Sequence, residues 1–284
     1  MNTVQRHRRQ TLAEACRKYA HVVNKQKPAG WKDIITVNIY DDQMQYIYCR
    51  TCKTANTIMR GILMMLTGKF RKYRRVEKIP PGIIYSSRYF KRLDTLLQSD
   101  KDWRLRKYFK FVFVREPLER LLSAYRDKVE SNKYPRLVVT IARKYRPRDY
   151  KPSVKPYKTT FAEFVRYVLD QHAAGRVLNR HWIPQYLGCP VCTPLFDFVG
   201  HYETLHRDAE FVVSKLKSRI QNTRQSLRVK NIRFPASSSH SKTKDLMQQM
   251  YATVPAAHIQ ALYKLYAIDY ALFGYKHPNV TRFK

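Results

Sequence analysis

The sequence predicts an α/β fold in which helices cover both faces of a parallel sheet. β-prone segments alternate along the chain with segments of helical periodicity, and each β-prone segment leads through a short polar turn into a helix. The 284 residues are 44% hydrophobic and 13% aromatic, which supplies apolar surface for a core despite a net charge of +34. We therefore expect a basic helical arm over residues 1–40, followed by one α/β domain over residues 41–284.

The first elements are a helix and a strand that leads into a second helix. Residues 1–25 predict a peripheral packing helix with one apolar face, formed by Leu12, Ala15, Cys16 and Tyr19. Residues 45–49 (QYIYC) predict a strand, and residues 50–56 (RTCKTAN) predict a polar loop. Thr57 is the expected N-cap of a buried helix that continues to residue 66. This order exposes helical N–H groups at one point, where anions bind.

Two further strand–helix units follow. Residues 108–114 (YFKFVFV) predict a buried strand, after which Pro117 suits the first turn of a helix. Residues 196–200 predict a third strand, with a helix from about residue 203 to 217. Parallel strands present their carboxyl ends at one edge of the sheet, where ligands bind in such folds. Lys53 and Arg115 are therefore expected at that edge.

The remaining segments are basic or close the core. Residues 133–158 hold nine Lys or Arg and a single acid, Asp149, and predict a Pro-punctuated loop. That loop is either simply solvated or forms the wall of a groove for a polyanion. Residues 218–244 are also basic, and residues 256–275 predict an amphipathic helix that closes the core.

The charge and the cysteines leave two classes of protein open. A net charge of +34 indicates a polyanionic partner or substrate. Two C-x-x-C pairs, Cys49 with Cys52 and Cys189 with Cys192, are compatible with a four-thiolate zinc site in a nucleic-acid-binding module. The long separation of the pairs favours another interpretation, in which Cys189 and Cys192 form a short disulfide loop or stay reduced.

The sequence lacks the patterns that are typical of membrane-spanning helices, signal peptides and Walker-type ATP-binding loops. No apolar run approaches the 18 or more residues of a transmembrane helix, and the first residues lack the apolar centre of a signal peptide. The loop at residues 50–56 also lacks the Gly-rich pattern of a Walker loop, which argues against ordinary ATP binding.

Two motifs resemble those of a known family. Residues 115–125 (REPLERLLSAY) resemble the 3′-phosphate-binding motif of sulfotransferases that use 3′-phosphoadenosine 5′-phosphosulfate (PAPS). Residues 47–57 (IYCRTCKTANT) resemble the 5′-phosphosulfate loop of Golgi carbohydrate sulfotransferases, most closely the branch that acts on chondroitin, dermatan and related glycans. The resemblance continues through residues 161–165, 181–185, 189–192, 196–204 and 262–275, and so covers most of the chain. Cys52, Met59 and Glu116 depart from the family pattern, which has Pro, Trp and Asp there.

The resemblance implies a P-loop-like sulfotransferase fold, PAPS as donor and a mechanism without a metal. It places Lys53 beside the bridging oxygen of the leaving nucleotide, whose developing charge the ammonium would neutralise. It also implies two phosphate-binding groups. The 5′-phosphate would be held by Lys53, Thr54, Ala55, Asn56 and Thr57, and the 3′-phosphate by Arg115, Arg120 and Ser123.

The attacking hydroxyl needs a base, and two candidates remain. His181 is the first, because an imidazole titrates near neutrality, and Glu203 is the alternative. Glu119 is expected to pair with Arg120 for structural reasons. Trp182 either stacks on a sugar face or belongs to the core.

The expected function is transfer of sulfate from PAPS to a glycan hydroxyl, namely O-4 of GalNAc in chondroitin- or dermatan-type chains. A zinc-stabilised nucleic-acid-binding module and an inactive sulfotransferase fold that binds glycans are the alternatives; under the main hypothesis nucleic acid is not a physiological partner. The resemblance implies a Golgi lumenal enzyme, normally with a membrane anchor that this sequence does not contain, so we expect a truncated lumenal domain or a soluble relative. Asn279 begins a possible N-glycosylation triplet.

Overall fold

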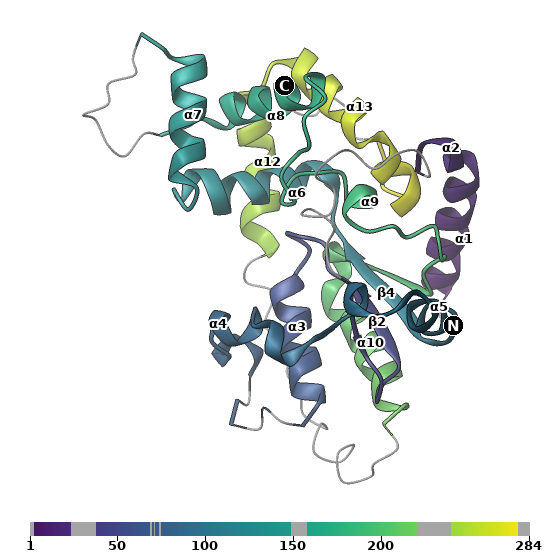
Figure 1. Ribbon diagram of the computed structural model, residues 1–284. Coiled ribbons are helices and arrows are strands. Elements are labelled where there is room, and N and C mark those ends of the chain that lie inside the picture. Colours follow the sequence, from purple (N-terminus) through teal and green to yellow (C-terminus); the bar gives the residue numbers. More distant parts are fainter. Residues whose placement is uncertain are drawn as a thin grey trace.

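A computed structural model describes residues 3–23, 38–68, 70, 72–73, 75–148, 158–220 and 240–277 (Figure 1). The larger described helices before the middle of the chain are α1 (Thr3–Lys18), α2 (Ala20–Val23), α3 (Asn56–Leu66), α4 (Pro81–Ile84), α5 (Gln98–Lys107) and α6 (Pro117–Tyr125). Those after it are α7 (Pro135–Tyr145), α8 (Phe161–Ala173), α9 (Gln185–Gly188), α10 (Leu205–Lys217), α12 (His240–Ala252) and α13 (Ala256–Phe273). A π-helical turn, Arg126–Glu130, directly extends α6.

A five-stranded mixed sheet forms the centre of the molecule. Its strands are β1 (Ile39–Asp41), β2 (Tyr46–Cys49), β3 (Lys91–Arg92), β4 (Phe109–Val114) and β5 (Phe198–His201), in the order β3-β1-β2-β4-β5. The three strands that the sequence predicts, β2, β4 and β5, are parallel neighbours. The predicted α/β class with a helix-covered parallel sheet is therefore confirmed. β1 and β3 add an antiparallel edge that sequence patterns did not indicate, because each is only two or three residues long.

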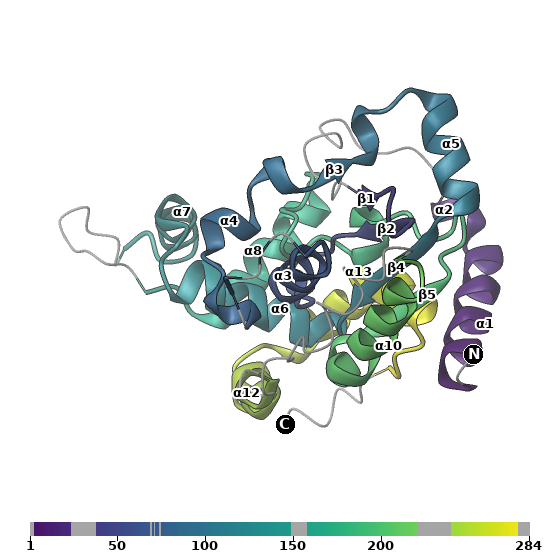
Figure 2. The same ribbon diagram turned by 90° about the horizontal axis from the view of Figure 1, so that it is seen from below.

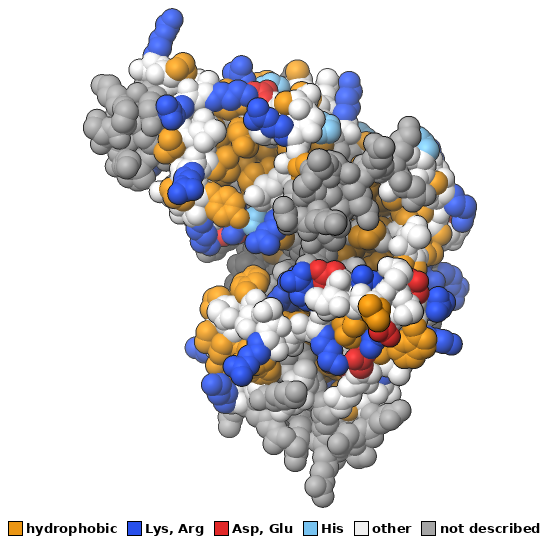
Figure 3. Space-filling view, viewed as in Figure 1, with side chains coloured by type: hydrophobic (Ala, Val, Ile, Leu, Met, Phe, Trp, Pro, Cys, Tyr) orange, Lys and Arg blue, Asp and Glu red, His pale blue; other side chains and the backbone are white. Residues whose placement is uncertain are grey.

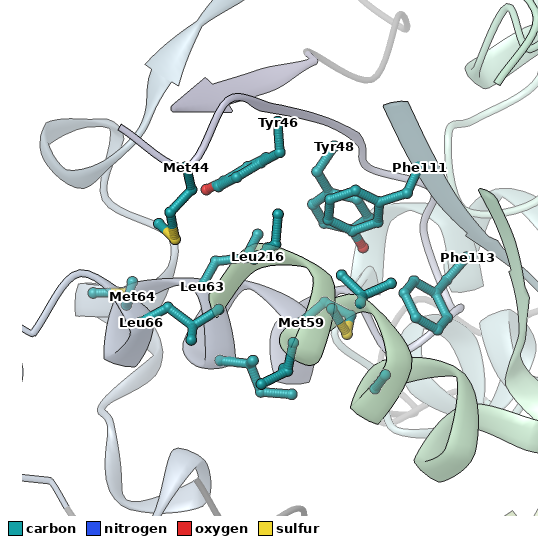
Figure 4. Packing of buried hydrophobic residues seen from close by; sticks show 14 of the residues in the cluster. Met44, Tyr46, Tyr48, Met59, Leu63, Met64, Leu66, Phe111, Phe113 and Leu216 are labelled. Atoms are coloured by element: carbon teal, nitrogen blue, oxygen red, sulfur yellow. The ribbon is translucent and has the colours of Figure 1, made fainter. Parts of the chain in front are cut away.

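Alternate residues of β4 face opposite layers of helices. Phe111 and Phe113 point into a core shared with α3 and α10, in which Tyr48 stacks on Phe111 (Figure 4). Val112 and Val114 point the other way, into a core shared with α1 and α13. All six residues of β4 are buried, as expected for a central strand with helices on both sides. Figure 2 shows α3 and α1 on opposite sides of the central strands.

The segment predicted as a basic loop contains a helix. α7 occupies Pro135–Tyr145, and its buried face consists of Val138, Ile141 and Ala142. These apolar residues recur at helical spacing between the basic ones, so packing against α8 decides the structure where the charge suggested a solvated loop. Residues 149–157 of that segment, most of residues 218–244 and the triplet at Asn279 lie outside the described residues.

Disulfide bonds join elements that are far apart in the sequence. Cys16 of α1 bonds to Cys192, and Cys49 at the end of β2 bonds to Cys189, with Cα atoms 5.5 and 6.1 Å apart. Cys52 stays free. The expected short loop between Cys189 and Cys192, and the zinc site made of both C-x-x-C pairs, are therefore wrong. In the folded chain, Cys189 and Cys192 each bond to a cysteine that is distant in the sequence. The C-x-x-C spacing could not indicate these partners.

The first helix packs on the domain, as the sequence predicts. Leu12 and Ala15 are buried against α13, and Arg8 donates to Asp208 over 2.6 Å. In the described residues, none of the helices combines the length and apolarity that a bilayer-spanning segment needs.

Candidate active site at the carboxyl edge of the sheet

The loop after β2 has an unusual backbone. Lys53 and Ala55 have positive φ angles of 70° and 62°, a region that non-glycine residues seldom adopt. Ala55 is the N-cap of α3, so the helix begins at Asn56 and the predicted cap at Thr57 is wrong. The left-handed residues turn successive N–H groups in one direction ahead of a helix N-terminus. Such a concave run of N–H groups binds anions.

Hydroxyl groups fix the shape of this loop. Thr51 donates to the carbonyl of Phe113 over 2.5 Å and lies 2.6 Å from the hydroxyl of Thr54. Thr54 is fully buried and also donates to the Thr51 carbonyl. The side chain of Thr54 therefore supports the loop from inside, which leaves its backbone N–H for an anion. The Thr57 hydroxyl contacts that of Tyr85.

Arg115 connects the two loops that the sequence predicted to meet. Its guanidinium donates to the carbonyl of Lys53 over 3.3 Å and to Glu119 over 2.8 Å, and it stacks 3.9 Å above the ring of Tyr202. Glu119 thus pairs with Arg115, and the predicted pair with Arg120 is wrong. Within the described residues, the buried Nε of Arg115 finds no acceptor, so one N–H of the group is free for a ligand.

A buried glutamine holds the backbone of Arg115. The Gln185 amide accepts from the N–H of Arg115 over 3.0 Å and donates to its carbonyl over 2.9 Å. Asp269 in turn accepts from the N–H of Gln185 over 2.6 Å. Burial raises the pKa of Asp269 to about 6. Sequence reasoning missed both residues in this role, because no local pattern marks a side chain that clamps a strand end 70 residues away.

Arg120 has a different role from the one that the sequence suggested. It is 1% exposed, and its guanidinium donates to the carbonyls of Cys52, Ile183 and Arg180 over 2.9, 2.8 and 3.4 Å. Burial lowers its pKa. The Arg120 side chain thus connects the loop before Lys53 with the segment before α9. Its predicted role as a phosphate ligand is therefore corrected: Arg120 is a buried residue that stabilises this loop. Ser123 lies on α6 and is partly exposed, so its hydroxyl remains a candidate ligand.

The ammonium of Lys53 is held by a carboxylate that sequence reasoning did not single out. Its Nζ lies 3.0 Å from Asp127, which also contacts Lys133 at 2.6 Å and Lys128 at 3.2 Å. Burial lowers the pKa of Lys53, and Asp127 partly offsets this. Although burial raises it, hydrogen bonds and charge from Lys133 and Lys53 hold the pKa of Asp127 well below its usual value. Asp127 belongs to the π-helical turn, a feature frequent at functional sites.

His181 is a buried imidazole without partners. It is 9% exposed, and neither ring nitrogen has a hydrogen-bond partner in the described part of the chain. Burial, followed by the charges of Lys128 and Arg180, lowers its pKa to about 3. The ring is therefore neutral near pH 7 and has a free lone pair that can accept a proton. The charge of Lys53 also acts on the His181 ring, so Lys53 and His181 lie near each other.

The other candidate base is fully engaged. One oxygen of Glu203 accepts from the N–H of Glu116 over 2.8 Å, and the other accepts from the hydroxyl of Tyr275 over 3.0 Å. Burial raises its pKa above the usual value. The carboxylate thus supports the N-terminus of α6, where it complements the helix dipole. Free ring nitrogens favour His181 over Glu203 as the proton acceptor.

A cavity of about 570 Å³ is lined by Arg180 and Trp182, the two sequence neighbours of His181, although His181 itself does not line it. Tyr134 lines it and also faces the His181 ring, with ring centroids 6.0 Å apart. Its other lining residues come from α7, α8 and the segment before α9, namely Leu137, Tyr167, Gln171, Val177, Leu178, Asn179, Arg180 and Trp182. Trp182 is 2% exposed and packs edge-on against Phe164, so it belongs to the core. Figure 3 shows hydrophobic side chains interspersed with Lys and Arg over α7 and α8.

Comparison with known proteins shows the family to which the chain belongs. The model of the Sulfotransferase family matches residues 38–276. This range includes every described strand and the loops that follow β2 and β4. The chain belongs to this family. It is 31% identical to carbohydrate sulfotransferase 14 from Danio rerio, over 98% of this chain and 73% of the relative. It is likewise 31% identical to carbohydrate sulfotransferase 11 from Rattus norvegicus, over 97% of this chain and 77% of the relative.

A third relative extends the similarity to another member. The chain is 29% identical to carbohydrate sulfotransferase 9 from Homo sapiens, over 96% of this chain and 60% of that protein. No solved structure matches the chain. The predicted family and enzyme class are confirmed: this protein is a sulfotransferase, and the family implies a PAPS donor. In the described residues no group of three or more His, Cys, Asp or Glu is placed to hold a metal ion.

Proposed function

We propose that this sulfotransferase transfers the sulfuryl group of PAPS to a hydroxyl of a glycan, namely O-4 of GalNAc in a chondroitin- or dermatan-type chain. The observation that carries the proposal is the meeting of the Lys53 loop and Arg115 at one edge of the sheet, with a neutral imidazole nearby. The names of the similar carbohydrate sulfotransferases support a glycan as the acceptor. The sequence resemblance supports O-4 of GalNAc as the position of transfer.

The residues at this edge fit a nucleotide with phosphate at both ends. The orphaned Nε of Arg115 offers a charged donor, and Ser123 lies two helical turns farther along α6. The N–H groups of Ala55, Asn56 and Thr57 stand at the start of α3 and suit a second phosphate. PAPS supplies an activated sulfuryl group whose transfer needs in-line positioning and charge stabilisation.

Each candidate residue then has one task. Lys53 neutralises the charge that develops on the leaving oxygen of the nucleotide. To reach this oxygen, the ammonium group leaves Asp127 for the more negatively charged PAPS. His181 accepts the proton of the attacking hydroxyl through a ring nitrogen that has no partner within the described residues. Thr51 and Arg120 keep the loop in its left-handed conformation.

The cavity beside His181 suits a sugar acceptor. Tyr134 and Tyr167 offer aromatic surface, Gln171 and Asn179 offer amides, and Arg180 offers a cation for a carboxylate. Pockets with apolar walls and a few converging polar groups are typical small-ligand sites. We place the GalNAc residue at the His181 end of this cavity, with the neighbouring uronate toward Arg180.

The two disulfide bonds fit an oxidising compartment, which supports the Golgi lumen as the place of action. The opposing hypothesis of a zinc-stabilised nucleic-acid module loses its metal site to these bonds. An inactive glycan-binding fold has no observation in its favour over the enzyme.

The test is a transfer assay with ³⁵S-labelled PAPS and desulfated chondroitin or dermatan. We expect label in the polymer, and degradation to disaccharides should place the sulfate at O-4 of GalNAc. Lys53→Ala should lower kcat by roughly 100-fold or more, with Lys78→Ala as an exposed-lysine control. Label at another position would correct the acceptor; no transfer to any glycan by the folded protein would refute the function.

A further inference from the structure

A second cavity lies at the opposite end of the same strands. It measures about 530 Å³ and spans the amino ends of β4 and β5, where Phe109, Lys110, Asp197 and Phe198 line it. β4 separates it from Arg115 by about 17 Å of extended chain. α1, α10 and the end of α5 contribute the other walls, and Figure 2 shows α1 and α10 close to β5. The cavity therefore shares no residue with the candidate active site.

This amino-end cavity is strongly basic. Six cations line it, against the single carboxylate of Asp197: Arg9, Arg106, Lys107, Lys110, Lys215 and Arg219. Asp197 is already neutralised by Lys110, whose Nζ lies 2.9 Å away. Arg106, Lys107 and Lys215 form no ion pair with any described residue, and the buried Nε of Arg9 finds no acceptor there. Like charges gathered around one hollow repel one another, so the arrangement favours an anion.

The cavity also offers an acceptor and an apolar surface. Gln5 is 3% exposed, its amide nitrogen donates to the carbonyl of Val199, and its Oε1 has no partner among the described residues. A buried acceptor without a donor costs free energy, which a ligand N–H or O–H would recover. Phe211 is half-buried and stacks on Phe198 with ring centroids 5.1 Å apart.

These three features together select a class of ligand. Sulfate satisfies the cations but brings no donor for Gln5, and hydrogenphosphate brings a donor but no apolar face for Phe211. An acidic glycan brings all three: sulfate or carboxylate groups, hydroxyl or acetamido donors, and the C–H face of a sugar ring. A cavity of this volume is in the range of ligand sites that hold one or two sugar rings.

We propose that the amino-end cavity is a second glycan-binding site, which holds an acidic segment of the same polymer outside the active site. The inference rests on the proposed glycan acceptor and extends it. A chain held at this site raises the effective concentration of its other segments near the active site. Long acceptors then bind more tightly than short ones, although both present the same sugar to His181.

The test compares two double charge reversals in the whole protein. Lys107→Glu/Lys215→Glu changes two exposed lysines of the cavity, and Lys78→Glu/Lys264→Glu makes the same change at exposed sites outside it. The probes are a fluorescent chondroitin sulfate polymer and a tetrasaccharide cut from it, in an equilibrium binding assay that needs no PAPS. We expect the cavity variant to raise Kd for the polymer roughly tenfold and the control less than twofold. The rise should be smaller for the tetrasaccharide, which is too short to occupy both sites at once.

Several outcomes would overturn the proposal. Equal losses in the two variants would show attraction by net charge alone. Competition by single-stranded DNA of equal charge as strong as that by unlabelled chondroitin sulfate would show a site for any polyanion. Because binding is measured without transfer, these results leave the proposed function untouched. Conversely, absence of sulfate transfer by the wild-type protein would refute the function, whatever the cavity binds.

Discussion

Both ends of β4 carry a cluster of cations, and the two clusters differ in burial and pairing. At the carboxyl end, Lys53, Arg115 and Arg120 are largely buried, and each contacts a carboxylate or backbone carbonyls. At the amino end, Lys107 and Lys215 are exposed and have no carboxylate partner in the described residues. Buried, paired cations define positions to a fraction of an ångström, whereas exposed ones attract polyanions without fixing them. The excess of positive charge thus comprises cations in two different states.

The largest expected effect concerns folding. Arg120→Ala removes a buried guanidinium and leaves the carbonyls of Cys52 and Ile183 without donors, so we expect the free energy of unfolding to fall by about 3 kcal/mol or more. Arg106→Ala at the amino end removes an exposed side chain, and should change it by less than about 0.5 kcal/mol. Urea unfolding of both variants measures the difference. Similar values would contradict the contrast between the two ends.

The next effect concerns the base. His181→Ala should lower kcat by roughly 100-fold, because the attacking hydroxyl loses its proton acceptor. Since burial holds the pKa of His181 at about 3, the wild-type rate should show no loss near pH 6.5 that an exposed histidine would cause. Steady-state kinetics between pH 5 and 8 provide both measurements. The exposed His206→Ala on α10 is the control.

A normal rate in His181→Ala would transfer the role to another group. Glu203→Gln would then be the informative variant. Loss of the Glu203 charge would also weaken the N-terminus of α6, where the carboxylate accepts from the N–H of Glu116. Measuring stability beside activity separates these two causes.

A smaller effect concerns the carboxylate that holds Lys53. Asp127→Asn leaves three ammonium groups without their shared partner, so Lys53 is less well positioned, and we expect kcat to fall about tenfold. Asp94→Asn, which removes an exposed partner of Arg92, should leave kcat unchanged. A rise in kcat for Asp127→Asn would instead mean that the carboxylate restrains the lysine.

The smallest effect is a pH dependence of stability. Burial raises the pKa of Glu116 to about 7 and that of Asp269 to about 6, so the folded protein holds these protons more tightly than the unfolded chain. Their contribution is therefore complete below about pH 4 and is lost as the pH rises through 6 to 7. The lowered pKa values of His181 and His201 act in the opposite direction over the same pH range, so the prediction concerns a difference between variants. From pH 5.5 to pH 8, the free energy of unfolding of Glu116→Gln should rise by about 1 kcal/mol relative to that of the wild type.

The control is the exposed Glu77→Gln, whose free energy of unfolding relative to the wild type should not change between these pH values. Chemical unfolding at the two pH values is the measurement. A Glu116→Gln variant that loses stability relative to the wild type toward pH 8 would reverse the sign and contradict the raised pKa of Glu116.

The sequence alone determined the strands that carry the site and the loops at their ends. Buried strands, their order and the segments that follow them depend on local patterns of apolar and polar residues, which is why Lys53 and Arg115 could be placed at one edge. Helices α10 and α13 were predicted for the same reason.

Only the tertiary structure decided which partners these residues meet. Cys16 bonds to Cys192, Arg120 donates to carbonyls about 60 residues away, and Asp127 reaches Lys53 across 74 residues. The amino-end cavity likewise joins α1, α10 and two strands that no single stretch of sequence connects. Periodicity reports on neighbours within a few residues, whereas pairing, burial and the resulting pKa values depend on how distant elements pack.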